Sequence, residues 1–270
     1  MLELTDIRKT FFRGTPNEVR ALRGVNLTID RGSFVCVIGT NGSGKSTLLN
    51  AVAGAFPLDS GRILLDGQDI TRWPEHRRAK LIGRVFQDPF SGTAPSMTIA
   101  ENLALAARRG LRRGPGLALN VGKRREMRER VRAMGLNLED RLNNPIGTLS
   151  GGQRQSLTLL MAGMVKPALL LLDEHTAALD PKSADQVIRL TEEFIAKDRL
   201  TTLMVTHSMQ QAAALGDRVI MMDRGQIVHD ISGIAKQRLR PEDLLSRFDE
   251  IRRANQLDET AAEMLHSQYV

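Results

Sequence analysis

Cysteine and aromatic residues are scarce in this chain of 270 residues. It contains one cysteine, Cys36, and only 4% of its residues are Phe, Trp or Tyr. A single cysteine excludes an internal disulfide, and a reducing, cytosolic setting fits this composition. We expect Cys36 to be a small buried apolar side chain rather than a redox group, because free cysteines are among the most buried residue types.

Long hydrophobic runs are also missing. No apolar stretch approaches the roughly 20 residues that a membrane-spanning helix needs, and the first ten residues lack the apolar segment of a signal peptide. We therefore expect any membrane association to go through a partner. Because 41% of the residues are hydrophobic, the chain can still bury a full core, as one large domain or two small ones.

The formal net charge of +7 has two interpretations. A basic excess can indicate nucleic-acid binding. However, much of the excess lies within residues 108–132, where aromatic side chains that could stack on bases are almost absent. The alternative is a solvated helical face, one that could lie near anionic lipid headgroups. We favour the solvated face and predict no nucleic-acid partner.

The strongest signal is a glycine-rich segment between a predicted strand and a predicted helix. The strand covers Phe34–Ile38, and the helix covers Thr47–Ala53 and stops at Gly54. Between them, residues 39–46 fit the pattern G-x-x-x-x-G-K-[ST] of a P-loop. Its backbone N–H groups can wrap phosphates at the positive end of the helix. The predicted nucleotide-binding residues are Gly39, Asn41, Gly42, Ser43, Gly44, Lys45, Ser46 and Thr47.

Polar side chains at other predicted strand ends suit the same chemistry. Lys45 would reach the β- and γ-phosphates, and the Ser46 hydroxyl would bind Mg²⁺. Asp173 follows four consecutive leucines, which indicate a strand buried on both faces, and suits a second Mg²⁺ contact. Glu174 beside it could deprotonate the attacking water.

Gln87 and His207 end two further predicted strands, Leu81–Gln87 and Thr201–Thr206. Gln87 could sense the γ-phosphate or a metal-bound water, so we count it among the metal contacts. His207 could hydrogen-bond the γ-phosphate. Each of these two residues, taken alone, would more often be an ordinary polar strand cap.

A second glycine-rich helix start lies at residues 149–153, Leu-Ser-Gly-Gly-Gln. It too is built to meet an anion. One nucleotide needs only one phosphate cradle, so the second suggests that this segment completes the site of another copy of the chain.

In this order, the motifs resemble those of the nucleotide-binding subunit of ABC transporters over roughly residues 1–230. The resemblance implies an α/β fold, with a P-loop NTPase core, an N-terminal antiparallel β subdomain and an inserted helical lobe at about 91–165. Residues 231–270 would form a C-terminal helical tail. It also implies an ATPase that forms a head-to-tail dimer around two ATP and drives transport through a partner permease. Import, a substrate-binding protein and a place at the cytoplasmic face of the bacterial inner membrane are further expectations.

The resemblance also assigns roles to single residues. Phe11, which we place with Phe12 in a loop between two antiparallel strands, would stack on adenine. Gln87 would couple the site to the permease, Glu174 would be the catalytic base, and His207 would position the γ-phosphate. Asp180 would signal across the dimer. The residues that would bind the partner copy's ATP are Ser150, Gly151, Gly152 and Gln153.

Some residues depart from the usual pattern. His175 stands where proline commonly follows the catalytic glutamate, and Gln155-Ser156 where glutamine-arginine is frequent. The sequence of residues 88–106, together with that of residues 173–184, looks most like ATPase subunits of bacterial importers of a poorly characterised branch, some associated with amino acids such as tryptophan. A soluble ATP-driven switch, similar to the cassette ATPases of iron–sulfur assembly, shares the same site and is the alternative function.

Segment 87–97 should be neither regular helix nor central strand, because it contains Pro89, Gly92 and Pro95. Phe90 is apolar in this turn-like run. We predict that it lines a groove for a short helix of the permease; the alternative is that it folds back on the core.

Overall fold

The computed structural model describes residues 1–111 and 119–253. Most of the Gly/Pro stretch at Gly110–Gly116, and residues 254–270 of the predicted tail, lie outside the described residues. No helix in the described ranges is both long enough and apolar enough to span a membrane.

The central sheet has six strands in the order β10-β9-β3-β8-β7-β6. All neighbouring strands are parallel except β9 and β10. Every residue of β3 and β8 is buried, which explains the unbroken apolar runs, since parallel strands are covered on both faces. Their bounds are Phe34–Gly39 for β3, Ile82–Val85 for β6, Leu169–Asp173 for β7, Thr202–Val205 for β8, Arg218–Asp223 for β9 and Gln226–Ser232 for β10.

A second, antiparallel sheet has the order β2-β1-β4-β5. Its strands are β1 (Leu2–Phe11), β2 (Val19–Ile29), β4 (Ser60–Leu65) and β5 (Gln68–Asp69). Its apolar residues share one core with one face of the central sheet. The predicted N-terminal β subdomain is therefore present. Phe11 is the last residue of β1, so its placement in the following loop was wrong.

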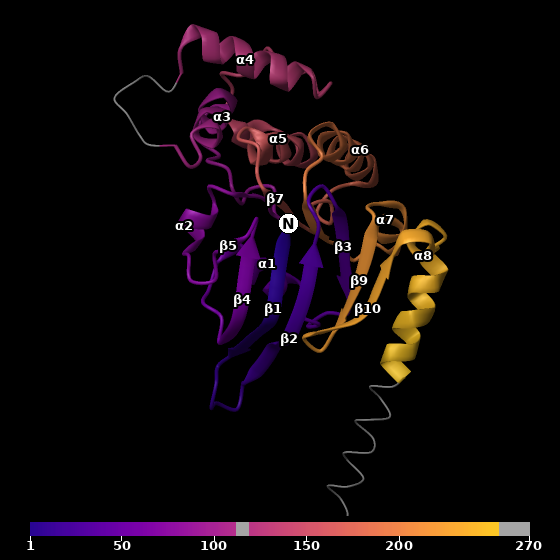
Figure 1. Ribbon diagram of the computed structural model, residues 1–270. Coiled ribbons are helices and arrows are strands. Elements are labelled where there is room, and N and C mark those ends of the chain that lie inside the picture. The colour runs from indigo at the N-terminus through magenta and orange to yellow at the C-terminus, as the bar shows by residue number, and fades with distance from the viewer. Residues whose placement is uncertain (112–118, 254–270) are drawn as a thin grey trace, which may run out of the picture.

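Helices cover the central sheet and form a lobe of their own. α1 (Lys45–Ala53) packs on β7 and β8 and ends at Gly54, as predicted. The lobe contains α3 (Ile99–Ala107), α4 (Val121–Arg132), the short 3₁₀ turn Ile146–Thr148 and α5 (Gly151–Gly163). It has a separate apolar core, and Figure 1 shows α3, α4 and α5 gathered above the strands. On α4, the side chains of Arg130 and Arg132 are 41% and 52% exposed and pair with Glu126 and Glu129, as expected of a solvated face.

The remaining helices are α2 (Glu75–Arg78), α6 (Pro181–Asp198), α7 (Met209–Ala214) and α8 (Gly233–Gln237), and residues 241–253 are also helical. In this last helix Leu244 and Phe248 are buried in the core beneath the central sheet. β10 runs past residue 230, where we placed the boundary of the tail. The described part of the tail is thus continuous with the core.

Candidate ATP site and the groove beside it

Three parallel strands deliver the predicted site residues to one edge of the central sheet. β3 ends in the P-loop, β7 ends at Asp173, and β8 leads through Thr206 to His207. Backbone hydrogen bonds fix this edge, because Glu174 N donates to Val205 O and Thr206 N donates to Val37 O. A ligand of an open α/β sheet binds at the carboxyl ends of the strands, which is where these residues meet.

The P-loop lysine is buried against its own loop. The Lys45 ammonium is 2.9 Å from the carbonyl oxygens of both Gly39 and Thr40. Burial lowers the pKa of Lys45, while the nearby carboxylates of Glu174 and Asp173 act to raise it. Lys45 therefore lies within electrostatic reach of both acids, at the point where the P-loop would hold a phosphate.

The backbone geometry of the P-loop requires glycine at positions 39 and 44, and it buries the hydroxyl of Ser43. A Cβ on Gly44, whose φ is +99°, would lie 2.5 Å from the carbonyl oxygen of Ala21. A Cβ on Gly39 would lie 2.4 Å from Ser43 Oγ. That Ser43 hydroxyl is buried and has no hydrogen-bond partner among the described residues. An unsatisfied buried hydroxyl costs free energy, and a phosphate oxygen in the loop would satisfy it.

The predicted base contacts the predicted γ-phosphate residue. Glu174 Oε1 lies 2.6 Å from His207 Nε2. The Glu174 side chain is 10% exposed and that of His207 is 45% exposed. Glu174 has a φ of +44°, a left-handed conformation that is strained for a glutamate and is common at functional sites. The Glu174 carboxylate and the His207 ring are therefore in direct contact at the carboxyl edge of the sheet.

The residues present suit Mg²⁺. Among the described residues no group of three or more His, Cys, Asp or Glu side chains could hold a metal by itself. Mg²⁺ at nucleotide sites, however, needs only one or two carboxylates together with substrate phosphates and waters. The predicted contacts, Ser46, Gln87 and Asp173, offer hydroxyl, amide and carboxylate oxygens. Gln87 is exposed, two residues after β6 ends.

The segment 149–153 lies apart from the P-loop of the same chain. Ser150 is exposed and caps α5, with reciprocal hydrogen bonds between Ser150 and Gln153. A Cβ on Gly152 would lie 2.7 Å from the Cβ of Ser183 on α6, so this glycine is needed for helix packing. No hydrogen bond or ion pair within the described ranges joins segment 149–153 to the P-loop. The phosphate-binding role of these residues stays a prediction.

Phe11 and Asp180 have structural contacts of their own. The ring of Phe11 packs edge to face with Phe56, with centroids 5.2 Å apart. Asp180 caps α6 by accepting a hydrogen bond from Ser183 N, and its hydrogen bonds to Ser183 lower the pKa of its carboxyl. Adenine stacking and signalling across the dimer stay predictions.

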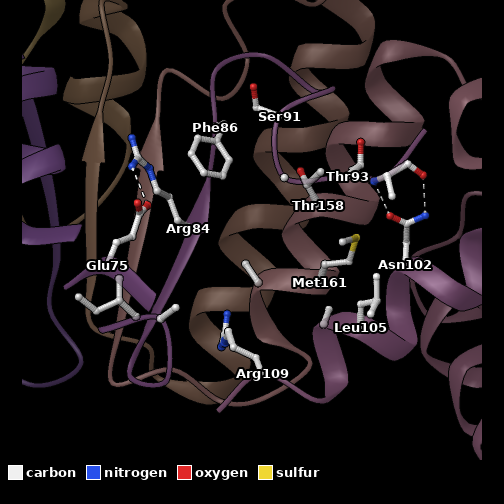
Figure 2. Close-up of a pocket in the computed structure, with 16 residues that line it drawn as sticks. Glu75, Arg84, Phe86, Ser91, Thr93, Asn102, Leu105, Arg109, Thr158 and Met161 are labelled. Atoms are coloured by element: carbon white, nitrogen blue, oxygen red, sulfur yellow. Dashed lines mark hydrogen bonds and ion pairs between the residues drawn. The ribbon is translucent and has the colours of Figure 1, made fainter. Parts of the chain in front are cut away.

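A groove lies next to the ATP site, between α2, β6, α3 and α5. Its volume is about 540 Å³, and its lining includes Glu75, Arg84, Phe86, Leu105 and Thr158. Figure 2 shows these side chains around the hollow.

Residues 91–94, which belong to segment 87–97, also line the groove, but Phe90 does not. The Phe90 side chain is 55% exposed, and its ring stacks on the guanidinium of Arg154, 3.7 Å away. The alternative that Phe90 folds back on the core was therefore wrong, because the side chain is more than half exposed. That Phe90 lines a groove for the permease stays a prediction, and this groove is not lined by it.

Two site-adjacent residues were missed by the sequence analysis. Arg84, inside β6, pairs with Asp173; a single arginine in an apolar run carries no signal of its partner. Arg154 sits beside the glycine-rich helix start and donates to three carbonyls of residues 146–149. Its position immediately after the motif was the only available signal.

Comparison with known proteins agrees with this geometry. The family model described as "ABC transporter" matches residues 22–177, more than half of the chain. The chain belongs to the ABC transporter family.

Relatives and solved structures support the membership. The tyrosine transport ATP-binding protein of Clostridioides difficile (strain R20291) is 42% identical over 92% of this chain and 99% of its own length. The thiamine import ATP-binding protein of Shigella boydii serotype 4 is 36% identical over 84% of this chain and 90% of its own. A dimeric ATP-binding cassette in a post-hydrolysis state, bound to ADP and phosphate, superposes with a TM-score of 0.73 at 28% identity, covering 86% and 98% of the two chains.

The expected fold and activity are thereby confirmed. The chain is an ATP-binding, ATP-hydrolysing subunit of an ABC transporter that dimerises and drives transport through partner permease subunits. Both the tyrosine and the thiamine relative are transport subunits by name, which favours the transporter over the soluble switch.

Proposed function

We propose that this subunit powers an importer of an amino acid, with an aromatic amino acid as the first cargo to test. The similarity to the tyrosine transport subunit over nearly the full length of both chains carries this proposal. The import subunit for thiamine supports the direction.

Within the site, Lys45, the P-loop amides and the Ser43 hydroxyl bind the phosphates of ATP. Ser46, Gln87 and Asp173 would hold Mg²⁺, which supplies positive charge against the β- and γ-phosphates. Glu174 takes the proton of the attacking water, and His207, 2.6 Å away, orients both that carboxylate and the γ-phosphate. Phe11 stacks on the adenine. Ser150, Gly151, Gly152 and Gln153 close the site of the partner copy, and Asp180 faces it across the dimer.

The groove between α2, β6, α3 and α5 receives the permease. It adjoins the segment that leaves the ATP site at Gln87, and its apolar wall includes Leu105, which is 56% exposed. Phe86, Ala106 and Met161 line the same groove, and a contiguous apolar patch with a polar rim is typical of a protein contact site. The assembly sits at the cytoplasmic face of the bacterial inner membrane and takes its cargo from a substrate-binding protein.

A groove variant tests this assignment. Leu105→Glu places a charge in the apolar wall, while Val121→Glu, at an 87% exposed position on α4, is the matched control. We expect L105E to bind ATP normally but to lose co-purification with the permease, and V121E to keep both. Retention of the permease by L105E at wild-type yield would contradict the assignment.

The cargo is tested by uptake of labelled tyrosine and tryptophan into vesicles that carry the reconstituted complex. We expect uptake only with ATP inside and with the substrate-binding protein present. ATP-dependent uptake of another class of compound would overturn the cargo proposal and leave the ATPase assignment intact.

A further inference from the structure

Arg84 connects the groove to the ATP site. Its Nη2 lies 2.6 Å from Asn50 Oδ1 and 3.3 Å from Asp173 Oδ2. Its Nη1 lies 4.0 Å from Glu75 Oε1 on the wall of the groove. The guanidinium also lies over the ring of Phe86, 4.5 Å from its centre. Figure 2 shows Glu75 and Arg84 directed toward each other beside Phe86.

The two carboxylates around Arg84 differ in exposure. The side chains of Arg84 and Asp173 are each only 14% exposed, whereas that of Glu75 is 56% exposed. A pair shielded from water interacts more strongly than an exposed pair. In this structure the guanidinium therefore favours Asp173, and Glu75 is a second, weaker partner within reach.

The guanidinium of Arg84 does not make all the hydrogen bonds that it could donate. Its Nε is buried without a hydrogen-bond partner in the part of the chain that the structure describes. A buried donor without a partner costs free energy, so the observed arrangement does not use all the bonds that the guanidinium can make. This leaves room for a second arrangement closer to Glu75.

We propose that Arg84 is a positioning residue that couples the groove to the metal ligand Asp173. Paired with Asp173, its positive charge opposes Mg²⁺ at the same carboxylate; drawn toward Glu75, it releases that carboxylate. A permease segment in the groove, by shifting Arg84 between the two acids, changes the Mg²⁺ requirement of the ATP site. This inference rests on the proposed role of Asp173 in Mg²⁺ binding.

Two variants act on the arginine in opposite directions. Arg84→Met keeps a long side chain but removes the charge that opposes Mg²⁺. Glu75→Gln removes the competing acid and leaves Arg84 to Asp173. The matched control is Arg62→Met, which breaks an exposed pair with Asp69 in the antiparallel sheet.

The measurement is the binding of a fluorescent, non-hydrolysable ATP analogue across a series of buffered Mg²⁺ concentrations, and in EDTA. We expect the half-saturating Mg²⁺ concentration to fall about threefold or more in R84M, as fits one partly buried charge pair. It should rise in E75Q and stay unchanged in R62M. Binding in EDTA should be the same for all four proteins.

The order E75Q, wild type, R84M, from highest to lowest Mg²⁺ requirement, supports the proposal. A purely structural role would weaken binding in both variants alike. An R84M requirement at or above wild type overturns the proposal, and if R84M does not fold, an E75Q requirement at or below wild type does so. Wild-type binding that is independent of Mg²⁺ would instead refute the proposed metal site.

Discussion

At the scale of single residues, the contact between Glu174 and His207 is the feature that the proposed chemistry depends on most. The 2.6 Å separation places a histidine donor on the carboxylate that receives the proton from water. Glu174 also has a left-handed backbone conformation, a strained state that persists only where the surrounding structure enforces it.

Glu174→Gln removes the proton acceptor and keeps the shape of the side chain. We expect ATP binding to remain, because no P-loop contact is lost, and turnover to fall by roughly 10²–10⁴-fold, as is usual for loss of a general base. Steady-state phosphate release beside an equilibrium binding assay measures both. Turnover near wild type in E174Q would remove Glu174 from this role.

His175, which departs from the family pattern and follows the proposed base in the sequence, is buried. Thr191 Oγ1 donates to Val187 O, so it accepts from His175 Nε2, 3.1 Å away, and the ring is the neutral Nε2–H tautomer. Burial lowers the pKa of His175 to about 4. In the unfolded chain this histidine has a pKa near 6.5. Between pH 6.5 and pH 4 it is therefore largely protonated in the unfolded chain and neutral in the folded protein.

Folding stability should therefore decline as the pH falls from about 6.5 to 4, by roughly 3 kcal/mol from this group. His175→Gln retains a side-chain N–H and cannot titrate. We expect H175Q to flatten the decline in urea-unfolding free energy over that pH range. Parallel pH profiles for the two proteins would mean that His175 is not the titrating group.

The residues that the sequence could predict are those held in fixed spacing by a motif. Lys45 and Glu174 are such residues, and the structure places them at one edge of the sheet, with Lys45 close enough to sense both acids. Arg84 and Thr191 could not be predicted, because their partners lie 89 and 16 residues away and no local pattern specifies them.

At the scale of secondary-structure elements, α1 is anchored at both ends. The P-loop leads directly into its first turn. At its other end, Arg78 of α2 donates hydrogen bonds to its last carbonyl oxygens. The Arg78 guanidinium donates to the carbonyl oxygens of Ala51 and Val52 and to those of Thr71 and Trp73. A cation at the C-terminus of a helix also suits the helix dipole.

Arg78→Met would remove the guanidinium donor from four carbonyl oxygens, of which that of Ala51 keeps a hydrogen bond from Gly54 N. We expect a loss of roughly 3 kcal/mol of stability, seen as a Tm lower by on the order of 5–10 °C. The control is Arg77→Met, since Arg77 is exposed and only stacks on Trp73; it should change Tm little. Equal Tm values for the two variants would rule out the anchoring role.

The hydrophobic pattern of the sequence predicts whether a segment is a helix or a strand, but it does not predict every residue at which such a segment ends. Helix α3 begins at Ile99 because Thr98 and Glu101 form a capping box. The strand predicted over Leu81–Gln87 ends at Val85, because the carbonyl of Phe86 is bound by the side chain of Gln155 instead of a neighbouring strand. Helix α2 was missed since four residues are too few for a periodic pattern.

At the scale of the whole molecule, the two glycine-rich helix starts lie on different helices, and the described structure does not join them by any hydrogen bond or ion pair. One is the P-loop at α1 and the other is segment 149–153 at α5. The exposed Ser150 is open to a second copy. The sequence of one chain suggests an ATP site shared between two copies only indirectly, because it contains two glycine-rich phosphate-binding segments for one nucleotide.

In the shared-site arrangement, which is central to the proposed function, each ATP lies between the P-loop of one copy and segment 149–153 of the other. Lys45→Ala damages the first half-site, and Ser150→Arg damages the second. In a mixture of the two variants, the mixed dimer pairs the intact P-loop of one with the intact segment of the other.

The test is ATP hydrolysis by K45A, by S150R and by their equal mixture, with a covalently linked pair of the two variants as a second form. We expect each variant alone to be inactive and the mixture to recover about a quarter of wild-type activity, since half of the dimers are mixed and each has one intact site of two. No hydrolysis in either the mixture or the linked pair would contradict the shared site.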